Sequence, residues 1–233
     1  MSAERGGPHA RWPGEECAAG RAAPWAHLLP GDRAIDLARI ESVLRERGPG
    51  RMRVDNWRPT DGTRRSAVLV PVYEHDGDTR VVLTRRSANM RAHTSEVSFP
   101  GGRSDDGETP LETAMREAEE EIGLAASLVR PIGELDMFVT VGSASLVHPI
   151  VGALADQPTL VAAPAEVEHI LHVSMAELLD DDVFREELWP IGERERPITF
   201  FELHGDTVWG ATAAMLRQLL ALSLGLTDDS LTY

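Results

Sequence analysis

One segment, residues 101–124, constrains the fold more than any other part of the chain, because it encodes a glycine-rich loop and both ends of the helix that follows. Thr109 is in position to cap the helix, and Glu112 completes a Thr-x-x-Glu capping box. Gly123 stands where a left-handed residue commonly ends a helix. The segment therefore predicts a helix over residues 110–122 with an apolar stripe that faces a core.

Three carboxylates share one face of this predicted helix. Glu117, Glu120 and Glu121 are spaced i, i+3 and i+4, so they lie on one turn and repel one another. A solvated surface is the ordinary explanation for such a face. Here, however, a glycine-rich loop precedes the helix, and Glu108 in that loop can pair with Arg116. Because Mg²⁺ and Mn²⁺ bind carboxylates together with phosphate oxygens and water, the segment predicts a divalent-cation site as the alternative to a solvated face.

The spacing of these residues resembles a known family motif. From Gly102 to Leu124 the chain reads G-x5-E-x7-R-E-A-E-E-E-I-G-L, which is similar to the Nudix box, G-x5-E-x7-R-E-U-x-E-E-x-G-U, where U is aliphatic. Every fixed position matches, and only Ala118 is small for its aliphatic position. The resemblance implies an α+β Nudix fold, an α/β/α sandwich with a mixed β-sheet. It also implies an enzyme that hydrolyses the phosphoanhydride bond of a nucleoside diphosphate linked to another group.

The resemblance further implies roles for individual side chains. The ligands of Mg²⁺ or Mn²⁺ would be Glu117, Glu120 and Glu121. Arg116 would pair with Glu108 and hold the loop and the helix in register. The bound cation would neutralise phosphate oxygens and lower the pKa of a water molecule. The general base would be Glu120 or Glu121, with Glu166, which follows a proline-rich loop, as the alternative.

A second motif, upstream, narrows the expected substrate. Residues 82–102 read V-L-T-R-R-S-A-N-M-R-A-H-T-S-E-V-S-F-P-G-G and resemble L-L-T-x-R-[SA]-x3-R-x3-G-x3-F-P-G-G, the signature of the coenzyme A pyrophosphatase branch. Val82 replaces a leucine, and Ser95 replaces the glycine. The substrate-binding residues that this resemblance implies are Arg86, Ser87, Arg91, His93, Gly101 and Gly102.

We therefore expect metal-dependent hydrolysis of coenzyme A or acyl-coenzyme A to 3′,5′-ADP and phosphopantetheine or its acyl derivative. Because Ser95 departs from the signature, ADP-ribose, NADH or another nucleoside diphosphate derivative is the alternative substrate. A non-catalytic Nudix module that senses a nucleotide is a further alternative. The complete set of box carboxylates disfavours it, because binding alone would not require all of them.

The rest of the chain predicts one domain with short extensions. Residues 1–34 are rich in Gly, Pro, Ala and Arg and predict a flexible N-terminal arm, residues 35–225 form the Nudix domain, and residues 226–233 form a C-terminal tail. Helices are expected at 36–47, after Ser174, and at 211–224, the last of them amphipathic. Strands are expected at 67–73, 80–84, 128–132, 137–141, 147–154, 169–173, 198–204 and 207–209.

Composition excludes several functional classes. All 23 basic residues are arginine, so a Walker A loop, a Schiff-base lysine and a kinase lysine are ruled out. The formal net charge of −15 argues against nucleic acid or an anionic membrane as the partner and favours a small-molecule nucleotide. A single cysteine, no apolar run of membrane-spanning length and no apparent signal peptide lead us to expect a cytoplasmic protein. The sequence is compatible with a homodimer but does not specify one.

Overall fold

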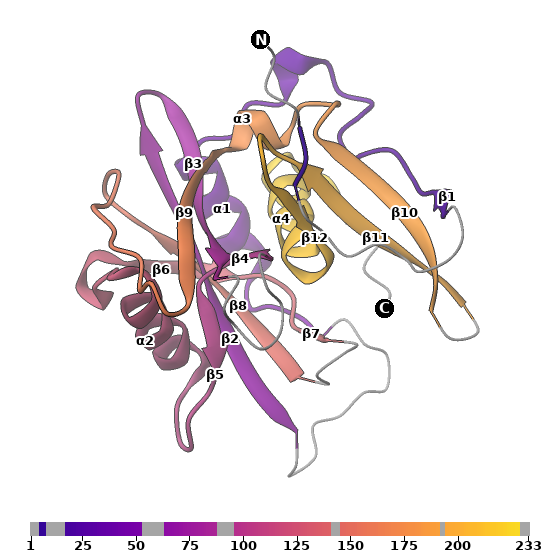
Figure 1. Ribbon diagram of the computed structural model, residues 1–233. Coiled ribbons are helices and arrows are strands. Elements are labelled where there is room, and N and C mark those ends of the chain that lie inside the picture. The colour runs from indigo at the N-terminus through magenta and orange to yellow at the C-terminus, as the bar shows by residue number, and fades with distance from the viewer. Residues whose placement is uncertain are drawn as a thin grey trace.

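The computed structural model describes residues 5–7, 17–52, 63–87, 96–140, 145–191 and 194–228. Within these ranges the chain forms an eight-stranded sheet and a separate four-stranded sheet (Figure 1). The larger sheet contains β2 (Arg64–His75), β3 (Asp78–Arg86), β4 (Val97–Ser98), β5 (Gly101–Arg103), β6 (Arg130–Glu134), β7 (Phe138–Val139), β8 (Ser145–Ala153) and β9 (Val167–Ser174). The smaller sheet contains β1 (Ala18–Ala19), β10 (Phe184–Ile191), β11 (Arg194–Glu202) and β12 (Thr207–Trp209). The helices are η1 (Pro30–Asp32), α1 (Leu37–Arg47), α2 (Pro110–Ile122), η2 (Ala126–Leu128), α3 (Met175–Leu178) and α4 (Gly210–Ser223).

The larger sheet is mixed, as predicted. Its central strand β2 pairs in parallel with β8 and antiparallel with β3 and β5. β2 and β3, which contain the strands expected at 67–73 and 80–84, form a hairpin, and Asp76 and Gly77 turn it with φ angles of 52° and 76°. Such positive φ values suit the tight turns that join antiparallel strands. β9 extends the sheet beyond β3, and β6 extends it beyond β8.

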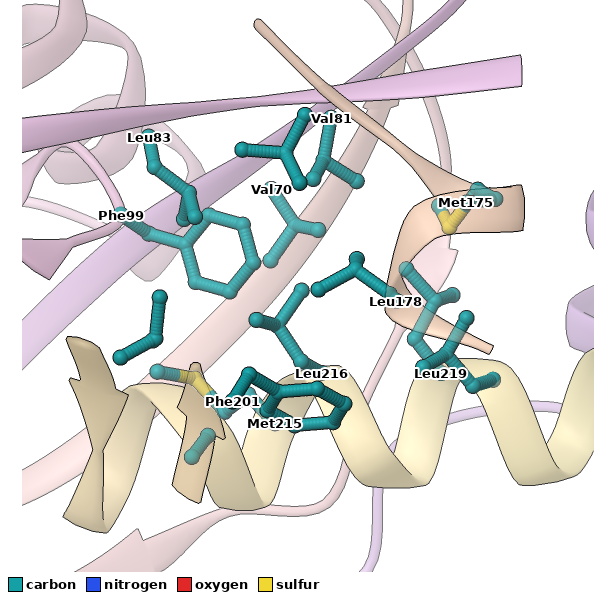
Figure 2. Packing of buried hydrophobic residues seen from close by; sticks show 14 of the residues in the cluster. Val70, Val81, Leu83, Phe99, Met175, Leu178, Phe201, Met215, Leu216 and Leu219 are labelled. Atoms are coloured by element: carbon teal, nitrogen blue, oxygen red, sulfur yellow. The ribbon is translucent and has the colours of Figure 1, made fainter. Parts of the chain in front are cut away.

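Helices cover both faces of the larger sheet (Figure 1). On one face, α2 packs Ala118 and Ile122 against Ala67 and Leu69 of β2. On the other face, α1 and α4 lie over a second apolar cluster. Figure 2 shows part of that cluster, in which Leu216 of α4 points toward Val70 of the sheet and Leu219 lies near Leu178 of α3. This arrangement confirms the α/β/α sandwich and places the predicted carboxylate helix on the face opposite α1 and α4.

The smaller sheet was only partly predicted. The strands expected at 198–204 and 207–209 are present as β11 and β12 and pair with each other. β10, which pairs with β11 along its whole length, was not predicted. α4 lies between the two sheets, so its residues are buried almost all round and the prediction of an amphipathic helix is wrong. Even Arg217 is buried, and it forms ion pairs with Glu186 (2.8 Å) and Asp228 (2.9 Å). No helix in the described ranges is long and apolar enough to cross a membrane.

The described part of the N-terminal segment contributes to the core. Trp25 is fully buried and packs edge-on against Phe184 and face-to-face with Phe201. Arg33 forms an ion pair with Asp181 at 2.6 Å. The Gly, Pro, Ala and Arg content of residues 1–34 did not indicate this contact, because it depends on aromatic partners that are distant along the chain.

Candidate active site

The loop and the helix that carry the site adopt the predicted local structure. The side chain of Thr109 accepts a hydrogen bond from the amide of Glu112, and the Glu112 carboxylate accepts one from the amide of Thr109 (2.8 Å), which together form the capping box. Gly123 ends the helix in the left-handed conformation, with φ of 66°. The predicted bounds, 110–122, are therefore confirmed.

Arg116 joins the helix to the loop through Glu108, as predicted. The guanidinium donates from Nε to Oε1 (2.7 Å) and from Nη2 to Oε2 (3.1 Å). Arg116 also donates to the carbonyl of Arg103 (3.0 Å), and Glu108 accepts from the amide of Asp105 and the hydroxyl of Thr113, both at 2.9 Å. These bonds, above all the one from Arg116, lower the pKa of Glu108 to about 2. Loop and helix are thus held together by a charged pair that stays ionised at neutral pH.

The three clustered carboxylates are not equivalent. Nη1 of Arg116 lies 3.0 Å from Oε1 of Glu117 and 3.0 Å from Oε2 of Glu120. The Glu120 side chain is 60% exposed, whereas those of Glu117 and Glu121 are 15% and 4% exposed. The helix therefore turns Glu117 and Glu121 toward the glycine loop and leaves Glu120 at the outer edge.

Two consecutive glycines allow this approach. A β-carbon on Gly102 would lie 2.5 Å from the carboxyl carbon of Glu117, so the absent side chain leaves room for that carboxylate. The amide of Gly101 donates to Oε2 of Glu121 at 3.1 Å. A β-carbon on Gly101 would lie 2.4 Å from the carbonyl oxygen of Ala67, because β5 packs tightly against β2 here. Both glycines thus shape the carboxylate site through their backbone.

The electrostatics of the site favour a bound cation. Burial raises the pKa of Glu117, and it raises the pKa of Glu121 to about 7 despite the bond from Gly101 and the charge of Arg86. The negative charge of Glu166 acts in the same direction on both. A nearby positive charge stabilises the ionised form of crowded carboxylates whose pKa values are raised. Their hard oxygen donors suit Mg²⁺ or Mn²⁺.

The carboxylates are not gathered into a single coordination group. Across the described ranges, no three His, Cys, Asp or Glu side chains are arranged so that they could hold a metal ion as they stand. Arg116 provides the physical reason, because its Nη1 already neutralises Glu117 and keeps Glu120 on the outer edge. The donor set fits a divalent cation, but Glu120 would have to leave Arg116 to join it.

Three further predicted site residues, Arg86, Ser87 and Glu166, lie where β3 ends and β9 begins. Nη1 of Arg86, at the end of β3, is 3.7 Å from Oε1 of Glu121. Ser87 is buried, and its amide donates to the carbonyl of Glu166 at 2.8 Å, so the exposed Glu166 is fixed beside the end of β3. Arg91 and His93 lie outside the described residues. The structure thus brings Arg86 and Glu166 to the carboxylate helix.

Sequence reasoning missed one contact within the site and one contact that joins the two sheets. It assigned Gly101 to the substrate and did not identify its amide as a donor to Glu121. It also gave no role to Arg85, which donates to Asp206 (3.0 Å) in the turn between β11 and β12 and so ties the smaller sheet to β3. Strand alternation could have placed Arg85 and Arg86 on opposite faces, but no local signal identifies Asp206 as the partner.

Comparison with known proteins finds a matching family model and similar sequences. The NUDIX domain model matches residues 63–191. The chain is 34% identical over 179 residues to "Nudix hydrolase 3" of Caenorhabditis elegans, which covers 70% of this chain and 75% of that protein. It is 36% identical over 164 residues to "Uncharacterized Nudix hydrolase NudL" of Photorhabdus laumondii, covering 70% and 86%. Among solved structures, a MutT/nudix family protein from Enterococcus faecalis aligns with a TM-score of 0.49 at 13% identity, covering 81% of this chain and 70% of that one.

Proposed function

The chain belongs to the Nudix hydrolase family, and on that premise we propose that it hydrolyses the pyrophosphate bond of coenzyme A or an acyl-coenzyme A. The products are 3′,5′-ADP and phosphopantetheine or its acyl derivative. One observation carries the choice of substrate: the segment that resembles the coenzyme A signature runs through β3, β4 and β5 and ends at the carboxylate helix. Its Arg86 lies 3.7 Å from Glu121.

The proposed metal site uses the three box carboxylates. Glu117, Glu120 and Glu121 hold Mg²⁺ or Mn²⁺, which, when bound, neutralises pyrophosphate oxygens and supplies an acidified water molecule. Arg116 keeps the helix against the glycine loop through Glu108, so the ligands on the helix stay in register with the loop. The amide of Gly101 fixes the orientation of Glu121.

The proton of the attacking water goes to a carboxylate. Glu120 or Glu121 is the first candidate for the general base, and Glu166 is the alternative. Glu166 is exposed and is held beside the site by the bond between its carbonyl and the amide of Ser87. A carboxylate that is not bound by a guanidinium can move to the water, which supports testing Glu166 alongside the box residues.

Arginine supplies the positive charge for the substrate. Coenzyme A carries a 3′-phosphate in addition to its pyrophosphate, and the planar guanidinium of Arg86 can bind a phosphate through two parallel hydrogen bonds. Arg91, His93 and Ser87 are proposed to contribute further substrate contacts. The strongly negative net charge supports a small nucleotide, not a nucleic acid, as the partner.

A substrate panel tests the proposal. The purified protein is incubated with coenzyme A, acetyl-coenzyme A, ADP-ribose or NADH, each with Mg²⁺ or Mn²⁺, and the products are separated by chromatography. We expect 3′,5′-ADP to form from coenzyme A with a higher kcat/KM than any product of ADP-ribose or NADH. Preference for ADP-ribose or NADH would overturn the proposed substrate, and failure to cleave any of the four would contradict catalysis by this site.

A further inference from the structure

Two consecutive arginines at the end of β3 serve different parts of the molecule. Arg85 donates to Asp206 at 3.0 Å and so contacts the smaller sheet, whereas Arg86 extends to the other face of the larger sheet, where α2 lies. Alternation of side chains along a strand accounts for the difference. Only the second arginine therefore bears on the carboxylate site.

Among the ion pairs of the described residues, Glu121 takes part in one, with Arg86. Arg116, within the same described ranges, forms ion pairs with Glu108, Glu117 and Glu120 but not with Glu121. The Glu121 side chain is 4% exposed, so water compensates its charge poorly. Its polar contacts in this part of the chain are the amide of Gly101 and, at 3.7 Å, the guanidinium of Arg86. Arg86 is thus the resident counter-ion of this carboxylate.

The geometry also allows the pair to separate. A distance of 3.7 Å between Nη1 and Oε1 is within ion-pair range but longer than a hydrogen bond, and the Arg86 side chain is 24% exposed. A guanidinium stays charged at every physiological pH, so it cannot leave the site by losing its proton. It can only move, and a second positive charge on Glu121 would repel it.

We propose that Arg86 is a positioning residue that exchanges partners: it neutralises Glu121 in the cation-free site and turns to a phosphate of the substrate once a divalent cation occupies that carboxylate. This inference rests on the proposed function of the site. It predicts an order of binding, in which the cation comes first and exposes the phosphate-binding group. Because coupling between two ligands is reciprocal, cation and nucleotide then strengthen each other's binding through Arg86.

Calorimetric titration of the nucleotide-free, full-length protein with Mn²⁺ tests the exchange without measuring activity. Arg86→Gln removes the competing charge and is expected to bind Mn²⁺ about tenfold more tightly than the unmodified protein. Arg86→Lys keeps the charge and should bind Mn²⁺ as the unmodified protein does. Arg85→Gln is the matched control, because it removes one arginine from the same strand on the opposite face, and its Mn²⁺ affinity should not change. In the activity assay, Arg86→Gln should raise KM for coenzyme A, because its phosphate contact is lost.

Equal or weaker Mn²⁺ binding by Arg86→Gln would overturn the partner exchange while leaving the proposed function intact. Absence of Mn²⁺ binding by all four proteins would overturn the proposed function and the inference together. A second measurement does not depend on the folding of any variant. Saturating Mn²⁺ should tighten the binding of 3′,5′-ADP to the unmodified protein, and a nucleotide affinity that is the same with and without Mn²⁺ would contradict the exchange.

Discussion

The Glu117 carboxylate occupies the space that a side chain on Gly102 would fill, since a β-carbon built there would lie 2.5 Å from the carboxyl carbon. The colliding group is the far end of a flexible side chain, so Gly102→Ala should displace the carboxylate at little cost in stability. We expect a melting temperature within a few degrees of the unmodified protein and at least a tenfold loss of Mn²⁺ affinity, because one ligand is moved. Calorimetry and thermal unfolding measure both. Gly31→Ala, where nothing lies within 4 Å, is the control, and unchanged Mn²⁺ affinity in Gly102→Ala would contradict the role of Glu117.

Glu108 should make the protein sensitive to acid. Hydrogen bonds, first of all from Arg116, lower its pKa to about 2 from an ordinary value of 4.5. A lowered pKa means that the stabilisation is complete above pH 4.5 and is lost as the pH falls toward 2, where the folded state must also take up a proton. Thermal unfolding followed from pH 7 to pH 2 should show a shallower acid decline for Glu108→Gln than for the unmodified protein. If the stability of the two proteins declined in parallel with falling pH, the pair of Glu108 and Arg116 would not account for the sensitivity to acid.

Substitutions of Glu120 and of its neighbour Glu119 form a matched pair that tests the role of the box carboxylates. Glu120 contacts Arg116, whereas Glu119 is exposed and lies outside the fixed positions of the box. Glu120→Gln removes a proposed ligand or base and is expected to lower kcat by about 100-fold or more. Glu119→Gln makes the same chemical change one residue away and should leave kcat unchanged. Steady-state kinetics on coenzyme A measure both, and full activity in Glu120→Gln would exclude that residue from catalysis.

The buried Arg217 should matter for stability and not for chemistry. It neutralises Glu186 on β10 and Asp228 after α4, and all three side chains are almost completely buried. Arg217→Met removes the buried positive charge that Glu186 and Asp228 face, which we expect to cost about 3–5 kcal/mol of unfolding free energy. Urea denaturation gives this value. At a temperature where the variant is folded, KM for coenzyme A should stay as in the unmodified protein; a change in KM without a loss of stability would contradict a purely structural role.

Local signals were sufficient for the loop and helix that carry the site. The capping box of Thr109 and Glu112 and the left-handed Gly123 fix the ends of α2 through hydrogen bonds within a few residues. The pair of Glu108 and Arg116 also lies within this one unit, and the resemblance to the Nudix box predicted the contact. The sequence could define these features because all of their partners are close along the chain.

Other features depend on partners that are distant in sequence. β10 contains charged residues and Pro190, so its own pattern is a weak strand signal, and only pairing with β11 makes it a strand. Trp25 enters the core because Phe184 and Phe201 surround it. α4 is likewise buried on all sides because the smaller sheet covers it. The spacing of apolar residues within α4 could not reveal that a second sheet lies there.

The sequence by itself thus determined the family, the mixed sandwich and the helix on which the carboxylates stand. Only the tertiary structure decided which of the carboxylates is buried and which arginine faces it. Glu121 is buried because β5 brings the amide of Gly101 against α2, and Arg86, not Arg85, meets it because the Arg86 side chain lies on the face of β3 that α2 covers. Hydrogen bonds between near neighbours can be inferred from spacing, whereas the burial of a charge depends on the elements that the fold packs around it.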